Sequence, residues 1–186
     1  MGATVVVAEY DPRWPERYQH ERERLLHAIG EYVVAIEHIG STAVPGLGAK
    51  PIIDIMVAVR SLPRDVSGCI EPLSRLGFEY VPRPDFKDSV FFCHGVWGPS
   101  TRHLHLTEYG SAFWNEKLLF RDYLRRHAET AAEYFALKCS LAARHAANRT
   151  AYTDAKSSFI LSIVNRARTT VPAAIVGAST ERRLHR

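Results

Sequence analysis

The stretch from Ile36 to Val59, IEHIGSTAVPGLGAKPIIDIMVAV, constrains the fold more than any other part of the chain. It predicts an apolar strand, a Gly-Ser-Thr turn, a loop rich in proline and glycine, and a second apolar strand. The second strand carries a single carboxylate, Asp54, among isoleucine, methionine and valine side chains. Aspartate is depleted in strands, and burial of its charge is costly unless the charge is paired or binds a metal. The pattern therefore indicates a site for phosphates and a cation.

Length and composition favour one folded domain. The chain has 186 residues, of which 46% are hydrophobic and 24% are charged, so it can bury a sizeable core. No apolar run reaches the roughly 18 residues that a membrane span needs, and the N-terminus does not resemble a secretory signal. The three cysteines form no CxxC pair, which is typical of reduced thiols in a cytosolic protein. We therefore expect a cytoplasmic protein that does not enter a membrane.

The charge balance bears on the partner. The formal net charge is +4, and much of the basic excess is scattered over predicted helices. A nucleotide or another anionic small molecule accounts for this excess at least as well as a nucleic acid does, and nucleic acid is the less favoured partner. The sequence leaves the oligomeric state open.

Hydrophobic periodicity predicts strands and helices in the first part of the chain and helices alone in the second. The expected fold class is α+β, a mixed sheet with two helices followed by a bundle of about three helices. One domain is expected over residues 1–170, with its sheet part at about 1–110, its helical part at about 111–168, and a flexible basic tail at 171–186. The predicted strands are 4–9, 33–39, 52–60, 78–81, 90–94 and 102–108, and the two helices among them are 12–29 and 61–77.

The Gly40-Ser41-Thr42 turn is the first candidate for phosphate binding. Glycine permits a close backbone approach, and the two hydroxyls offer further hydrogen bonds to phosphate. An ordinary turn at a strand exit has the same composition. Lys50, which precedes the second strand, would either hold phosphates or cover the strand edge.

A second candidate is the sequence Arg102-His103-Leu104-His105. On a strand, His103 and His105 point to the same face, and histidine is the commonest metal ligand. With Asp54 they predict a site for a divalent metal ion, and the sequence does not distinguish Mg, Mn or Zn. A solvent-facing histidine pair is the open alternative. His38 is a further candidate, either as a general base or as a hydrogen-bonded core histidine.

The helical half supplies basic side chains. The basic side chains on the last two predicted helices include Lys138, Arg144, Arg149 and Lys156, and Tyr152 precedes Lys156 by one turn. They would hold a triphosphate if these helices face the Asp54 strand. Otherwise they belong to a solvated helix surface.

The chain resembles the GrpB family, within the nucleotidyltransferase superfamily, from about Tyr10 to Arg166. The segments that carry the resemblance are YDPRWPERY, IEHIGSTAVPGLGAKPIIDIMV, RHLHL, RDYLRRH, ALKCSLA and AYTDAKSSFI. The resemblance implies a nucleotidyltransferase-like mixed sheet with flanking helices, a Gly-Ser turn, and two divalent cations held by carboxylates. Asp54 matches the first acid of that pattern. Met56 occupies the second acidic position, and the histidines of HLH replace the third acid.

Three hypotheses of function follow. The first is a metal-dependent nucleotidyltransferase that moves a nucleotidyl group from a nucleoside triphosphate to a small molecule or a protein. Asp54, His103 and His105 would ligate the metal, His105 would also take part in catalysis, and His38 would act as the base. The triphosphate would contact Gly40, Ser41, Thr42, Lys50, Arg102, Lys138, Tyr152 and Lys156. The second is a metal-dependent enzyme of other chemistry, using the Asp/His/His site on an anionic substrate. The third is a non-catalytic accessory or ligand-binding module, as in relatives fused to dephospho-CoA kinase.

Overall fold

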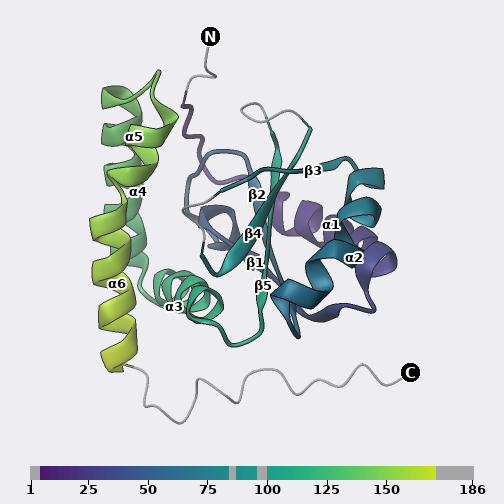
Figure 1. Cartoon of the computed structure of the whole chain (residues 1–186). Helices are drawn as coiled ribbons and strands as arrows, with labels where there is room; N and C mark the ends of the chain where they lie inside the picture. Colours follow the sequence, from purple (N-terminus) through teal and green to yellow (C-terminus); the bar gives the residue numbers. More distant parts are fainter. Residues whose placement is uncertain (1–4, 84–86, 96–99, 171–186) are drawn as a thin grey trace.

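The computed structural model describes residues 5–83, 87–95 and 100–170. The part of the chain that it describes contains a five-stranded mixed sheet with helices on both faces (Figure 1). The strand order is β1-β2-β5-β4-β3; β2 and β5 run parallel, and the other neighbours run antiparallel. The strands are β1 (Val33–Ile39), β2 (Ile53–Val59), β3 (Phe78–Tyr80), β4 (Ser89–His94) and β5 (Arg102–Glu108).

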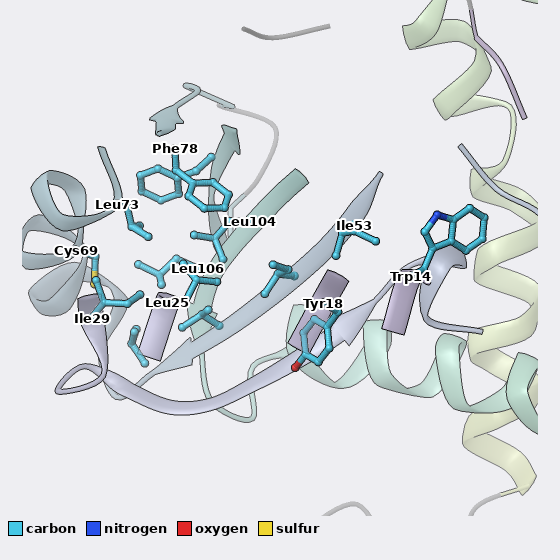
Figure 2. Packing of buried hydrophobic residues seen from close by; sticks show 14 of the residues in the cluster. Trp14, Tyr18, Leu25, Ile29, Ile53, Cys69, Leu73, Phe78, Leu104 and Leu106 are labelled. Atoms are coloured by element: carbon cyan, nitrogen blue, oxygen red, sulfur yellow. The ribbon is translucent and has the colours of Figure 1, made fainter. Parts of the chain in front are cut away.

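The first face of the sheet is covered by α1 (Trp14–Ile29) and α2 (Leu62–Arg75), which Figure 1 shows side by side. Both helices have a proline in their first turn, where its missing N–H costs no hydrogen bond. Their apolar residues pack on alternate residues of β2 and β5 in the main core, part of which is drawn in Figure 2. Buried side chains of this core include Leu25, Ile29, Ile53, Ile55, Val57, Cys69, Leu73, Phe78, Phe92, Leu104 and Leu106.

The second face is covered by α3 (Ala112–Arg126). Trp114 of this helix packs with Ile39, Met56 and Ala58 of the sheet. Beyond α3, the helices α4 (Ala128–Arg144) and α6 (Ser157–Thr170) build a second core against α3 and the loop after β1. The short helix α5 (Arg149–Asp154) connects them. The strand β2, which carries Asp54, is therefore buried between two helical layers (Figure 1).

Most predicted elements are confirmed within a residue or two, and 33–39 and 102–108 match completely. The prediction of a strand at 4–9 is wrong for the described residues 5–9. They form only an isolated bridge between Ala8 and Ala49, because Val5 packs against helical residues instead of a neighbouring strand. The last of the three predicted helices, in which Tyr152 precedes Lys156, is divided into α5 and α6, with a turn at 155–156. The predicted tail, 171–186, lies outside the described residues.

Candidate functional site

The sheet brings Asp54 and the two histidines together. Asp54 lies opposite His103 in the parallel pair of β2 and β5, and Met56 lies opposite His105. Residues opposite each other in a ladder share a face, so Asp54, His103 and His105 all point toward the helical side that begins with α3. His103 Nδ1 donates a hydrogen bond of 2.9 Å to Asp54 Oδ1. The carboxylate remains 29% exposed.

The Gly40 turn lies directly against Asp54. Ile39, the last residue of β1, pairs with Asp54, and the chain then turns through Gly40 into the 3-10 helix η1 (Ser41–Ala43). Gly40 has a φ of 72°, in the region that favours glycine, and a Cβ placed there would lie 2.5 Å from Asp54 Oδ2. Only glycine fits between the turn and the carboxylate. Thr42 points elsewhere, since its hydroxyl donates to Ile52 O at 3.1 Å.

Four basic side chains surround this carboxylate, and all four interact electrostatically with Asp54. We call Lys50, Lys117, Arg149 and Lys156 the basic cluster. Lys50 and Lys156 lie over the ring of Tyr152, with Nζ 5.4 and 4.3 Å from its centroid. Arg149 Nη2 lies 3.5 Å from His103 Nε2, on the side of the ring away from Asp54.

The fourth member of the basic cluster, Lys117, comes from α3. Its Nζ lies 4.9 Å from the ring centroid of Phe113, one helical turn earlier. The Phe113 ring lies 5.4 Å from that of His105. Lys117 therefore approaches the sheet on the side of His105 and Met56, whereas Arg149 approaches on the side of His103.

The cluster shifts the proton affinities of its members. Burial raises the pKa of Asp54, but the hydrogen bond from His103 and the neighbouring positive charges outweigh it and lower that pKa to about 2. Burial and the charge of Lys50 lower the pKa of Lys156 to about 8. Burial, with Lys117 nearby, lowers the pKa of His105 to about 3, so its imidazole is neutral at pH 7. Burial also lowers the pKa of Lys50 and of Lys117, and the charge of Asp54 opposes both shifts. The site at neutral pH is an ionised carboxylate among basic side chains.

His38, predicted as a general base, lies on the opposite face of the sheet, because it pairs with Ile55 instead of Asp54. Its ring stacks on Tyr18 with 4.6 Å between centroids, and its Nε2 lies 3.0 Å from Thr42 Oγ1. Because the Thr42 hydroxyl donates to Ile52 O, His38 Nε2 is the donor in this contact. Burial lowers the pKa of His38 to about 4. The geometry gives this histidine a structural position and does not support a role as base.

Two further predicted phosphate ligands are engaged elsewhere. Arg102 points to the α1 face and forms an ion pair with Glu21, with 3.0 Å between Nε and Oε2. Lys138 is 3% exposed and donates to the carbonyl of Gly48, in the loop before β2. Burial and the charge of Lys156 lower the pKa of Lys138 to about 7. Lys138 therefore holds the loop that carries Lys50, and it supports the Asp54 site only indirectly.

Sequence reasoning missed Lys117. It lies on α3 three residues after Trp114 and four after Phe113, which both pack against the sheet. The signal that could have identified it is a lysine on the core-facing stripe of a helix that also has solvent-exposed positions. Arg149 was among the basic side chains that the sequence placed on the helical half, but α5 is too short to show a periodic face that would single it out.

The donor set does not make the two-cation site that the resemblance implies. One oxygen of Asp54 receives the His103 hydrogen bond, and the other lies against Gly40. Glu37, which shares this face of the sheet, is bound by Arg121 Nη1 at 2.6 Å. Among residues 5–83, 87–95 and 100–170, no group of three or more His, Cys, Asp and Glu side chains is placed to hold a metal ion. Metal ligation by Asp54, His103 and His105 stays a prediction, and no step below depends on it.

A cavity of about 420 Å³ lies beside β1 and η1, and Asp54 is not among its lining residues. Its lining includes Tyr18, His38, Thr42, Arg121 and Arg125. Arg121 is bound to Glu37 and to the His38 carbonyl, and Arg125 Nε donates to Ala43 O at 2.9 Å. These contacts support the loop after β1, and we assign the chemistry to the Asp54 side.

None of the described helices is long and apolar enough to cross a bilayer.

Several proteins are similar in sequence to this chain over most of its length. A UPF0157 protein of Streptomyces coelicolor is 40% identical over 163 residues, which cover 87% of this chain and 83% of that protein. A dephospho-CoA kinase of Mycolicibacterium paratuberculosis is 29% identical over 189 residues, which cover 89% of this chain but only 46% of the kinase. In that relative the matched region is thus about half of a longer protein.

Solved structures give the fold. The crystal structure of the conserved protein GrpB from Enterococcus faecalis superposes with a TM-score of 0.81 at 32% identity, covering 89% of this chain and 98% of that one. The Cid1 poly(U) polymerase bound to MgATP superposes with a TM-score of 0.54 at 14% identity, covering 80% of this chain and 50% of that one. The second likeness concerns the fold alone, which is nucleotidyltransferase-like. The family model described as GrpB protein matches residues 4–166, and this chain therefore belongs to the GrpB family.

Proposed function

We propose that this protein binds the phosphates of a nucleoside triphosphate beside Asp54 and transfers a nucleotidyl group to a hydroxyl of a small molecule or a protein. The observation that supports this most is the convergence of the basic cluster on one strand carboxylate next to a Gly-Ser turn. The four cations come from four separate segments: the loop before β2, α3, α5 and the turn between α5 and α6. Such a site favours a ligand with several negative charges.

The roles of the residues follow from their positions. Gly40 lets the backbone approach a phosphate closely, and Ser41 adds a hydroxyl at the start of η1. Arg149 offers a planar fork of donors that matches a phosphate, whereas Lys50 and Lys156 act as point charges. Tyr152 orients both lysines through its ring.

The proposed transfer is a displacement at phosphorus. The acceptor hydroxyl oxygen bonds to the α-phosphorus, the bond from the α-phosphorus to the bridging oxygen breaks, diphosphate leaves, and the hydroxyl proton passes to solvent. Catalysis of such a displacement consists chiefly of positioning and of stabilising charge on the phosphoryl and leaving-group oxygens. The basic cluster can supply both.

The test is nucleotide binding followed by a transfer assay. We expect titration calorimetry to detect binding of at least one of ATP, GTP, CTP and UTP, with affinity reduced about tenfold or more by Arg149→Met or Lys156→Met. Arg75→Met is the matched control, because Arg75 is an exposed residue of α2 on the other face. Absence of binding to all four nucleotides, or affinity unchanged in both cluster variants, refutes the binding site. Transfer is then measured with nucleotides labelled at the α-phosphate.

A second candidate is a ligand-binding accessory module without turnover. The specific observation in its favour is Met56, which is fully buried at the position where the superfamily pattern has a second acid. The match to about half of a dephospho-CoA kinase is consistent with an accessory role. Binding without label transfer to any acceptor supports this candidate over the first. The Asp/His/His enzyme of other chemistry stays a prediction from the sequence.

A further inference from the structure

Met56, two residues after Asp54 on β2, is covered by α3. Met56 is completely buried, and it packs with Trp114, Phe113 and Leu118 of that helix. Lys117 projects from the same helix and interacts with both Asp54 and His105, the residue opposite Met56. A basic side chain thus approaches, from α3, the part of the site where the pattern that this chain resembles has an acid and a divalent metal ion; burial lowers its pKa, and the charge of Asp54 opposes that shift.

The charges around Asp54 are unbalanced in the free protein. Lys50, Arg149 and Lys156 add to Lys117, and the single carboxylate among them already accepts a hydrogen bond from His103. Glu37 cannot offset this excess, because Arg121 engages it. A divalent cation added here would meet four positive groups and one available carboxylate oxygen, itself packed against Gly40. A polyanion would instead relieve the repulsion among the cations.

We propose that the Asp54 site binds the polyphosphate of a nucleotide as the free anion, with Lys117 providing the charge that a divalent cation would otherwise supply. This inference rests on the proposed function, since it specifies the form in which the nucleotide is bound. A metal-complexed nucleotide has part of its negative charge cancelled, so it is the weaker ligand for four cations. Affinity should rise with the number of phosphates, from the monophosphate to the triphosphate.

The first experiment compares ATP binding to the full chain in EDTA with binding in excess MgCl₂ or MnCl₂ at the same ionic strength. We expect the dissociation constant in EDTA to be equal to or lower than the values with metal, and affinity to increase in the order AMP, ADP, ATP. Binding that requires metal, or that weakens about tenfold or more in EDTA, overturns the inference and leaves the proposed function intact. Absence of binding in every condition instead refutes the proposed function.

The second experiment compares a substitution that should weaken ATP binding with one that should leave it unchanged or strengthen it. In EDTA, Lys117→Met should weaken ATP binding about tenfold or more, and Lys117→Arg should retain most of the affinity. Lys87→Met, at an exposed lysine, is the matched control. Asp54→Asn should bind ATP as tightly as the native chain or more tightly, because it removes a negative charge; at a metal-bridged site the same change abolishes binding.

The fold of each variant is checked by circular dichroism before binding is measured. If Asp54→Asn fails to fold, the native chain in EDTA and the Lys117 pair decide the question. Unchanged affinity in folded Lys117→Met contradicts the assigned role of Lys117.

Discussion

The two faces of the central sheet use neighbouring residues of the same strands for different purposes. On the α1–α2 face, Ile55 and Leu104 are fully buried in a continuous apolar core. On the α3 face, the adjacent Asp54 and His103 form a hydrogen-bonded pair surrounded by the basic cluster. The first face is lined by apolar side chains at the centre of its strands, whereas the second gathers four basic side chains around one carboxylate.

This difference shows how a small sheet supports a costly polar site. Alternation along β2 and β5 lets the apolar face provide stability while the opposite face holds charges that repel one another. The α3 face is not wholly polar, because Met56 and Trp114 form an apolar cluster beside Asp54. Substitutions on either face therefore separate the contribution of the apolar core from that of the basic cluster.

The largest effect is expected from Leu104→Ala on the apolar face. Leu104 lies between His103 and His105 in the sequence, but its side chain points to the α1–α2 core, where it is completely buried. Removing its side chain should lower the free energy of unfolding by about 2–5 kcal/mol, measured by urea denaturation. ATP affinity of the folded variant should stay within about twofold of the native value, as for independent sites. A parallel loss of affinity would show that the two faces are coupled.

His38 should make stability depend on pH. Its folded-state pKa is lowered by burial from 6.5 to about 4, with Arg121 and Arg125 of α3 adding to the effect and Asp54 opposing it. The stabilisation is therefore complete above pH 6.5 and is lost as the pH falls from 6.5 toward 4, by at most about 3 kcal/mol.

The measurement is urea unfolding at a series of pH values for the native chain and for His38→Gln, which can still donate to Thr42. The variant should show a smaller decline over this interval. Identical pH profiles would contradict a neutral His38 in the folded state.

Gly40→Ala should reduce both stability and binding. The residue has a φ of 72° and a ψ of −171°, a conformation that costs a non-glycine residue about 1–3 kcal/mol, and the added Cβ would collide with Asp54 Oδ2. Gly46→Ala is the matched control, since Gly46 has a φ of 77° and no atom within 4 Å of its Cβ position. We expect only Gly40→Ala to weaken ATP binding, by about tenfold, in titration calorimetry. Equal effects of the two substitutions would mean that backbone strain alone is responsible.

The smallest effect is expected from Arg102→Gln. Arg102 binds Glu21 on the α1 face, and Arg24 also bonds that carboxylate at 3.0 and 3.1 Å. Loss of one of two partners should cost about 1 kcal/mol in thermal or urea unfolding. ATP affinity should not change. A fall in affinity would restore Arg102 to the phosphate site that the sequence predicted.

Sequence patterns predicted the sheet well because its strands carry strong local signals. β1 and β2 are apolar runs bounded by a glycine turn and a proline-rich loop, and HLHL alternates with period two. The segment 4–9 has the same apolar character as a strand. Whether this segment pairs as a strand depends on the surface it packs against, and residues 5–9 pack against helices and a loop. Propensity could not decide that.

The candidate site was predicted in part for the same reason. Asp54 and Gly40 stand out locally, as a charge in an apolar strand and a glycine at its turn. Lys117 and Arg149 do not, because they reach Asp54 only through the tertiary placement of α3 and α5. His38 and Arg102 carry suitable chemistry but are one residue out of phase with Asp54 and His103 in the ladders, so they point to the other face.

The sequence by itself determined the mixed sheet, the Gly-Ser turn, the lone carboxylate and the histidines that share a strand face, because these depend on periodicity and on conformations that few residues adopt. The tertiary structure alone decided which cations meet at Asp54. Contacts between segments far apart in the chain depend on strand register and helix packing, and no local pattern encodes them. The charge excess that defines this site is thus a property of the assembled fold.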